Sequence, residues 1–194
     1  MRKLVLLAFA AIPLFAQVTV APPAKEKEKE ARKPIVAAPA HAPGAITKFR
    51  IIATTGADDL RENSEIKAFV ILKDGRRVES KTLNCRVSAR SGQRVCDAFP
   101  AKSRRTVEWA VDPRAVIRPD DVHRFGLAFQ TGRKGPLDSA DNWDLHVLEV
   151  EYVTAADPAR RDEAGTFPLL KTGGRGYVYR FKTSDSWESE PIQR

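Results

Sequence analysis

Acidic side chains are dense in two short segments, and carboxylate oxygens are the ligands that Ca²⁺ prefers in proteins. The first segment holds Asp58 and Asp59, and the second holds Asp138 and Asp141. If two loops at one end of a sheet brought these four carboxylates together, they would form a calcium site. The alternative is that Asp59 and Asp141 cap turns through their own backbone amides and that Arg61 pairs with one of them. No Asp-x-Asp-x-Asp-Gly pattern is present, so both interpretations stay open.

Other residues give little sign of catalysis. The sequence contains no Gly-x-Ser-x-Gly, His-Glu-x-x-His or phosphate-loop motif. His123 and His146 stand near no nucleophile in the sequence. Acidic residues are plentiful enough for a glycosidase pair, but nothing singles out two of them. The sequence therefore predicts a protein that is not an enzyme and requires no cofactor, with Ca²⁺ as the one metal that its loops suggest. A small secreted hydrolase is the less favoured alternative.

The first sixteen residues have the three-part pattern of a secretory signal peptide. Arg2 and Lys3 are positive, residues 4–15 are apolar, and Ala16 is small enough to precede a cleavage site. An apolar stretch this short, interrupted by Pro13, is a poor membrane span. We expect cleavage after Ala16 and export to the periplasm or the extracellular space. An uncleaved anchor is the alternative.

Residues 17–45 form a predicted disordered spacer rich in Pro, Ala, Lys and Glu. The whole chain has a formal net charge of +8. Residues 1–16 and the spacer contribute +2 each, which leaves +4 for residues 46–194. That surplus is small, and the basic doublets are scattered along the chain, so we expect no nucleic-acid partner.

Cys85 and Cys96 enclose a turn signal, Ser91-Gly92. In an exported chain, two cysteines so placed predict a disulfide that closes a β-hairpin and stabilises the fold by about 3 kcal/mol. A metal pair would need further ligands, and a redox pair is usually separated by two residues.

The rest of residues 46–194 consists of short segments in which apolar and polar residues alternate between Gly, Pro, Asp and Asn punctuation. This pattern predicts an all-β fold, an antiparallel sandwich of about eight strands. In the segment 142–153 the alternation changes phase, which predicts a β-bulge near Val147. Trp187 lies in a polar tail and is expected to dock on the sandwich. The predicted shared core comprises Trp109, Phe125, Leu127, Phe129, Leu145 and Val150.

Two segments, TTGADDLRENSEIKAFVILKDGRR and DSADNWDLHVLEVEYV, together resemble the PLAT domain (polycystin, lipoxygenase, alpha-toxin) or a bacterial relative of it. The resemblance implies an eight-stranded sandwich that binds lipids, membranes or proteins and has no chemistry of its own. The Cys85–Cys96 segment and an extension from about Ala155 have no obvious counterpart in that family. The residues that match its motifs are Thr55, Gly56, Trp143, Leu145, Leu148 and Val150.

These observations predict an exported, monomeric, single-domain binding module with a lipid, glycan or protein ligand and peripheral contact with the cell envelope. A structural cell-envelope protein is the alternative. We expect the working surface at one end of the sandwich, where the segments 56–64 and 136–144 meet, because loops on a rigid sheet commonly carry recognition.

Overall fold

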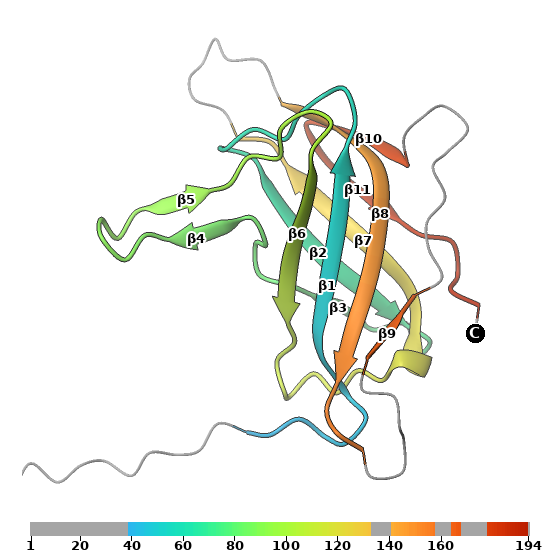
Figure 1. The fold of residues 1–194 in the computed structure, drawn as a ribbon. Coiled ribbons are helices and arrows are strands. Elements are labelled where there is room, and N and C mark those ends of the chain that lie inside the picture. Colours follow the sequence, from blue (N-terminus) through green and yellow to red (C-terminus); the bar gives the residue numbers. More distant parts are fainter. Residues whose placement is uncertain (1–38, 133–140, 158–163, 168–177, 194) are drawn as a thin grey trace, which may run out of the picture. The chain divides into compact units, whose positions relative to one another are not determined.

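Two antiparallel sheets make up the fold in the computed structural model (Figure 1), which describes residues 39–132, 141–157, 164–167 and 178–193. One sheet has the strand order β10-β8-β1-β6, with β9 beside β8, and the other has the order β11-β7-β2-β3. The strands are β1 (Ile46–Thr55), β2 (Glu65–Leu72), β3 (Arg77–Glu79), β4 (Cys85–Val87), β5 (Arg94–Cys96), β6 (Arg104–Ala110), β7 (Val122–Gln130), β8 (Asn142–Thr154), β9 (Ala164–Thr166), β10 (Tyr179–Lys182) and β11 (Ser184–Glu188).

The prediction of an all-β antiparallel sandwich is therefore confirmed, with eleven strands in the described part of the chain. A short 3₁₀ helix, Pro119–Asp121, precedes β7. In the same residues, no helix has the length and apolar character of a membrane span. The predicted signal peptide and most of the predicted spacer lie outside the described residues.

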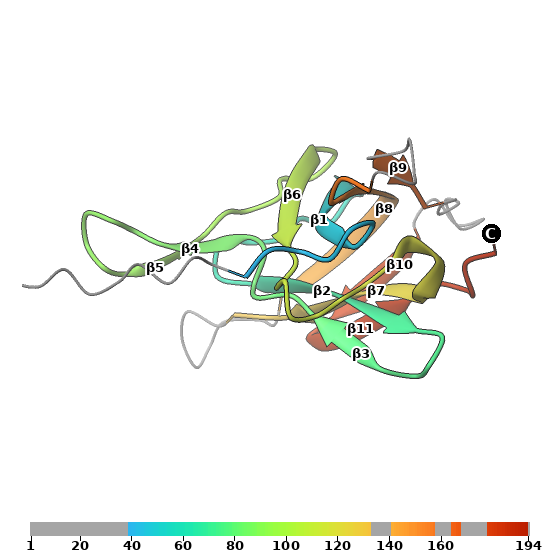
Figure 2. The same ribbon diagram turned by 90° about the horizontal axis from the view of Figure 1, so that it is seen from below.

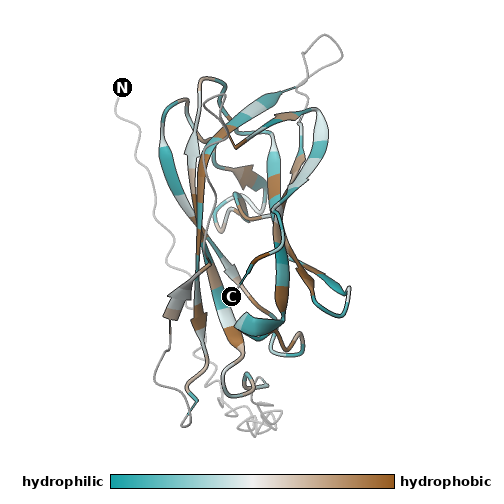
Figure 3. Ribbon diagram, turned by 90° about the vertical axis from the view of Figure 1, so that its right-hand side faces the viewer, coloured by the Kyte–Doolittle hydropathy of each residue, from teal (hydrophilic) through white to brown (hydrophobic). Residues whose placement is uncertain are grey.

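The core lies between the two sheets, and alternation along the strands explains why (Figure 3). Successive side chains of a strand point to opposite faces, so every second residue of β1, β2 and β7 is turned inward. All six residues of the predicted core are buried in one cluster. Trp187 is half-buried and packs against that cluster, so its predicted docking is also confirmed.

The predicted bulge lies in β8. The pairing of β1 with β8 shifts between Thr54↔Val147 and Thr55↔Leu145, so that His146 is the extra residue of β8 at this point. Because the side-chain period of a strand is two, this extra residue moves the buried set from one parity to the other. Trp143 and Leu145 are buried before it, and Leu148 and Val150 after it.

The segment after Ala155 is part of the sandwich rather than an appendage. β10 pairs with β8 in one sheet, and β11 pairs with β7 in the other. Thr183, between the two strands, has a left-handed backbone with φ 57°. Because this residue turns the chain from one sheet to the other, the C-terminal segment ties the two sheets together.

β4 and β5 form a two-stranded ribbon, called the arm here, which comprises residues 85–96. Figures 1 and 2 show it projecting away from both sheets. The predicted disulfide joins Cys85 to Cys96, whose Cα atoms are 3.9 Å apart, and Gly92 in the turn has a left-handed φ of 67°. The predicted disulfide-closed hairpin is confirmed.

Candidate functional site

The predicted meeting of two loops at one end of the sandwich is found in the structure. We call this region the loop end: residues 56–64, residues 141–144 and Arg180 of β10. The backbone N–H of Gly56 donates to the carbonyl of Asp144 at 2.7 Å, and the N–H of Asp144 donates to the carbonyl of Asp58 at 3.2 Å. Asp138 and its neighbours 133–140 lie outside the described residues.

Asp141 anchors the first loop to the start of β8. Its carboxylate is fully buried, and Oδ2 accepts hydrogen bonds from the N–H of Arg61 at 3.0 Å and from the Ser64 hydroxyl at 2.7 Å. The Nε of Arg61 lies 3.3 Å from Oδ1 of the same carboxylate. A buried carboxylate needs such donors to offset the loss of water. Arg61 is therefore the partner of Asp141, as one part of the turn-capping interpretation predicted, but the carboxylate anchors a distant loop and does not cap a turn through its own backbone amides.

Asp144 makes a second anchor next to the first. Its side chain is buried, and its Oδ2 accepts a hydrogen bond from the N–H of Asp58 at 3.3 Å. Arg180 donates to Asp58 Oδ2 at 3.0 Å, and its Nε lies 3.5 Å from Asp144 Oδ1. Burial is the main cause that raises the pKa of Asp58, Arg180 opposes it, and the neighbouring carboxylates add to the rise.

At the loop end, neighbouring segments of the chain approach one another so closely that there is no room for a side chain at two glycines. A Cβ on Gly56 would come within 2.9 Å of the Asp144 Cβ. A Cβ on Gly132 would lie 1.8 Å from the carbonyl oxygen of Asn63. The Thr-Gly pair of the sequence motif therefore has a packing reason, because only glycine lets the two segments touch.

Calcium does not fit the described carboxylates in this arrangement. Guanidinium groups, not open space, lie beside the Oδ1 atoms of Asp141 and Asp144, although neither oxygen accepts a well-formed hydrogen bond. No three acidic side chains among the described residues of the loop end bring ligand oxygens within 4.8 Å of one another. Asp59 makes no side-chain hydrogen bond or ion pair with the described part of the chain that would draw it into such a group. Because Asp138 is not described, calcium binding stays a prediction.

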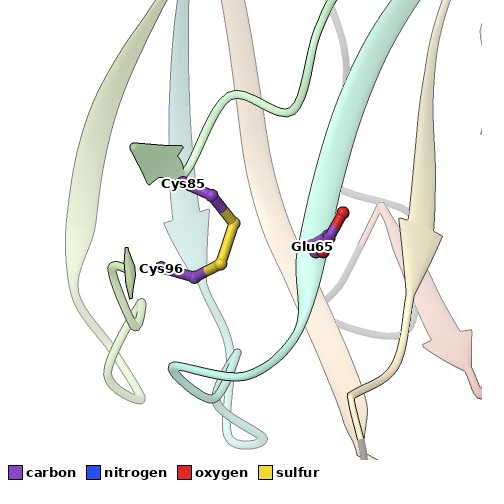
Figure 4. Close-up of side chains that lie close together, drawn as sticks. All are labelled: Glu65, Cys85 and Cys96. Carbon is purple, nitrogen blue, oxygen red and sulfur yellow. A yellow bond between two sulfur atoms is a disulfide. The ribbon is translucent and has the colours of Figure 1, made fainter. Parts of the chain in front are cut away.

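Side chains that lie within metal-binding distance do occur elsewhere, at the base of the arm. Figure 4 shows Glu65 of β2 facing Cys85 and Cys96. The two sulfur atoms form the disulfide and so offer no thiolate ligand. Glu65 is already paired with Arg94 at 2.7 Å. This group therefore joins the arm to the sandwich instead of forming a metal site.

The hollows along β6 do not resemble a catalytic pocket. One of about 530 Å³ has acidic residues in its walls, among them Glu79, Glu108 and Asp112. Hydrogen bonds from Lys67 lower the pKa of Glu79, and those from Arg114 hold the pKa of Asp112 well below its usual range. Lys48 pairs with Glu108 at 3.2 Å. General acid–base catalysis uses groups whose pKa is shifted toward neutrality, and these two shifts run the other way.

Positive charge is concentrated in one stretch, residues 81–106, which we call the basic segment. It contains seven lysines and arginines and one acidic residue, a net charge of +6, whereas residues 46–194 as a whole carry +4. The segment forms the arm, the turn beyond it and the first half of β6. The rest of residues 46–194 is therefore net negative, and the basic surplus belongs to one continuous segment of the chain.

Four of the seven cations have no carboxylate partner within the described residues. They are exposed and lie before the arm, at its tip, in the turn before β6 and at the start of β6: Lys81, Arg90, Lys102 and Arg105. The other three form ion pairs, Arg86 with Asp97, Arg94 with Glu65 and Arg104 with Glu149. These pairs are largely exposed to solvent, so each contributes little to stability and is easily exchanged for another anion.

Sequence reasoning missed both the basic segment and Arg180. A local charge count over 81–106 would have found the first, because its signal is in the sequence. Arg180 lies 122 residues from Asp58, and no local pattern predicts that contact. The exposed large apolar residues of the described chain are Val87, Val95, Val116 and Val153, none of them at the loop end.

Comparisons with known proteins add a similarity of fold. No family model matches the chain, and no curated protein matches it. A crystal structure of alpha-toxin of Clostridium perfringens from an avian strain is similar, with 10% identity and a TM-score of 0.47. The match covers 77% of this chain and 33% of that protein, so this chain spans about a third of its length.

Proposed function

We propose that this protein is an exported, non-catalytic interaction module that binds polyanionic surfaces through its basic segment and needs no cofactor to do so. One observation carries the proposal: a net charge of +6 lies within residues 81–106, on and beside an arm that stands clear of both sheets. A predominantly positive segment of this kind attracts and orients anionic partners over several ångströms.

The state of the cations supports this function. Unpaired, exposed arginines and lysines repel one another, so the free protein gains when an anion approaches them. The exposed ion pairs of Arg86, Arg94 and Arg104 can be exchanged at little cost, because water already screens them. Up to seven cations are therefore available to a partner.

The arm itself is built for contact. A two-stranded ribbon is marginally stable alone, and the Cys85–Cys96 disulfide restricts its unfolded forms. Rigid presentation lowers the entropic cost of binding. A ribbon that contributes no buried apolar side chain to the core does not serve the sandwich's own stability.

The side chains of the loop end stabilise the fold and offer little for recognition of a partner. Asp141 and Asp144 are occupied by hydrogen bonds and arginines, and no large apolar side chain is exposed there among the described residues. We therefore propose the basic segment, not the loop end, as the working surface.

The test is binding of inorganic polyphosphate, measured by calorimetry at low and at physiological salt. The double variant Arg90→Glu/Arg105→Glu changes two unpaired cations of the basic segment. The matched control, Lys73→Glu/Arg118→Glu, makes the same charge change at exposed positions outside that segment. We expect salt-sensitive binding that the first variant loses and the control keeps. Equal losses in both variants, or no binding by the wild type, would contradict the proposal.

A further inference from the structure

Strand β6 is the outermost strand of its sheet, on the side from which the arm projects (Figure 1). The N–H of Thr55 donates to the carbonyl of Ser103 before β6, and the N–H of Val111 after β6 donates to β1 in the same way. Because hydrogen-bonded pairs alternate along an antiparallel ladder, every second residue of β6 bonds to β1. The residues between them turn their N–H and C=O groups to an open edge, where no described residue pairs with them: Arg104, Thr106, Glu108 and Ala110.

Two hollows of about 530 Å³ each follow this open edge, between β6 and the chain that runs from β3 toward the arm. Leu83 lies in the wall of both, so the two hollows are adjacent. Each wall also has a large aromatic side chain, Trp109 in one hollow and Phe99 in the other. An extended peptide beside β6 would therefore find room for its side chains as well as partners for its backbone.

The unpaired charges in the walls of these hollows are positive. Lys81 lines one hollow and Arg105 lines the other, and both belong to the four cations without a carboxylate partner in the described part of the chain. The acidic side chains of the walls are already held in ion pairs: Glu79 with Lys67, Glu108 with Lys48, Asp112 with Arg114 and Asp97 with Arg86. Carboxylates on the face of a partner strand that is turned to the hollows would complement the two cations.

From this juxtaposition of an open strand edge with unpaired cations we infer that the polyanion is an acidic polypeptide segment, which binds in extended form as a further strand beside β6. The inference rests on the proposed function and names the chemical class of its partner. Backbone hydrogen bonds to the open edge supply affinity, and acidic side chains on every second residue supply selectivity. A polyanion without a peptide backbone, such as polyphosphate, meets the cations but cannot extend the sheet.

The charges of β6 also select the partner. Exposed edge strands are commonly short, bulged or interrupted by proline, which prevents them from pairing with other chains. β6 has seven residues in unbroken register with β1 and no proline. Arg105 has the same parity as the inward-facing Val107 and Trp109, so a partner strand without acidic residues would cover its charge and leave it unpaired, which is costly. An acidic strand provides the missing partner.

The experiment measures, by calorimetry, the binding of a synthetic peptide of about ten residues, the length of a long strand, in which Glu alternates with Thr. Thr106→Pro removes one N–H of the open edge and leaves the hydrogen bonds between β6 and β1 in place. Thr106→Ala is the matched control, because it keeps that N–H. We expect Thr106→Pro to weaken peptide binding about tenfold or more, and Thr106→Ala to stay within about twofold of the wild type. Both variants should bind polyphosphate as the wild type does, because their cations are intact.

A second measurement uses the wild type alone, so it does not depend on the folding of Thr106→Pro. The same peptide, N-methylated at every backbone amide, keeps its carboxylates but has no N–H to donate, and it should bind about tenfold more weakly or less. Amide hydrogen exchange at Thr106 and Glu108 should slow when the unmodified peptide binds. Polyphosphate should not slow it, because only a strand offers a carbonyl acceptor to these N–H groups.

Polyphosphate binding separates the two proposals. If the protein binds polyphosphate but not the peptide, or binds the N-methylated peptide as well as the unmodified one, the strand inference is wrong and the proposed function stands. The same holds if a folded Thr106→Pro binds the peptide as Thr106→Ala does. A dimer that Thr106→Pro converts to a monomer would show that a second copy occupies the edge, which also overturns the inference. If the protein binds neither the peptide nor polyphosphate, both proposals are wrong.

Discussion

Replacing Asp141 by alanine removes the main link between the first loop and β8. The carboxylate is fully buried and accepts two hydrogen bonds through Oδ2, while Arg61 lies beside Oδ1. A hydrogen bond to a charged group contributes about 1.5–3 kcal/mol. Two such bonds, one of them to a backbone N–H that would be left without an acceptor, predict a loss of about 3–5 kcal/mol in the free energy of unfolding.

The conservative variant Asp141→Asn sharpens this prediction. Its amide oxygen can take the place of Oδ2 and accept both hydrogen bonds, but its NH₂ group then faces the Arg61 guanidinium and the charge attraction is lost. We expect an intermediate loss of about 1–2 kcal/mol. Asp59→Ala is the control, because Asp59 is a neighbouring acid with no anchoring contact among the described residues, and it should change stability by less than about 0.5 kcal/mol.

Urea denaturation followed by tryptophan fluorescence measures all three variants. We expect the loss in the free energy of unfolding to be smallest for Asp59→Ala, larger for Asp141→Asn and largest for Asp141→Ala. If Asp141→Ala were as stable as Asp59→Ala, the carboxylate would not anchor the loop, and its standing as a calcium ligand would rise.

Four further predictions follow from the same structure. Trp143→Ala should lower the free energy of unfolding by about 3–5 kcal/mol in urea, because the ring is fully buried, stacks on Phe181 with centroids 5.2 Å apart and donates to a threonine hydroxyl. The free energy of unfolding of Asp58→Asn, minus that of the wild type, should increase as the pH rises from about 3 to about 7. Burial raises the pKa of Asp58 above 3.8, so the stability that its protonated form provides is present below that value and is lost as the pH rises through the folded-state pKa; the opposite trend would mean that the Arg180 ion pair outweighs burial. Cys85→Ser/Cys96→Ser should speed amide hydrogen exchange in residues 86–95 and leave β7 unchanged, since the ribbon has few other supports. Calcium at millimolar concentration tests the calcium prediction that stays open at the loop end: because arginines lie beside Asp141 and Asp144 we expect no change in the unfolding temperature, and a saturable rise would show that a site forms.

The sheets and their core follow from local pattern. Alternation in β1, β2 and β7 identifies the buried faces because the pleat of a strand and the two-sidedness of a sandwich have the same period. The phase change in β8 locates the bulge for the same reason. The disulfide follows from two cysteines around a turn signal, which fixes a hairpin register that places Cys85 opposite Cys96.

The chemistry of the loop end could not be predicted in the same way. Whether a carboxylate binds a metal or anchors a loop depends on the donors around it, and the arginine shared by Asp58 and Asp144, Arg180, comes from β10, far along the chain. The segment after Ala155 was predicted to be an extension because it has no obvious counterpart in the PLAT family. The pairing of β10 with β8 and of β11 with β7 depends on contacts between residues far apart in the sequence, which no local pattern predicts.

The basic segment could have been predicted from the sequence but was missed. Its charge is visible in the sequence, but averaging over residues 46–194 mixes a segment of net +6 with a net negative remainder. The distribution of charge, not its sum, decides what a surface attracts. The structure adds that this segment coincides with the projecting arm and with the exposed valines.

Amide chemical-shift mapping of the ¹⁵N-labelled protein during a polyphosphate titration shows whether polyanions bind at the basic segment, because it locates binding residue by residue. We expect saturable shifts in residues 81–106, largest around Arg90 and Arg105, that diminish as salt is added. Shifts confined to residues 56–64 and 141–144, or spread evenly over all exposed basic residues, would contradict it.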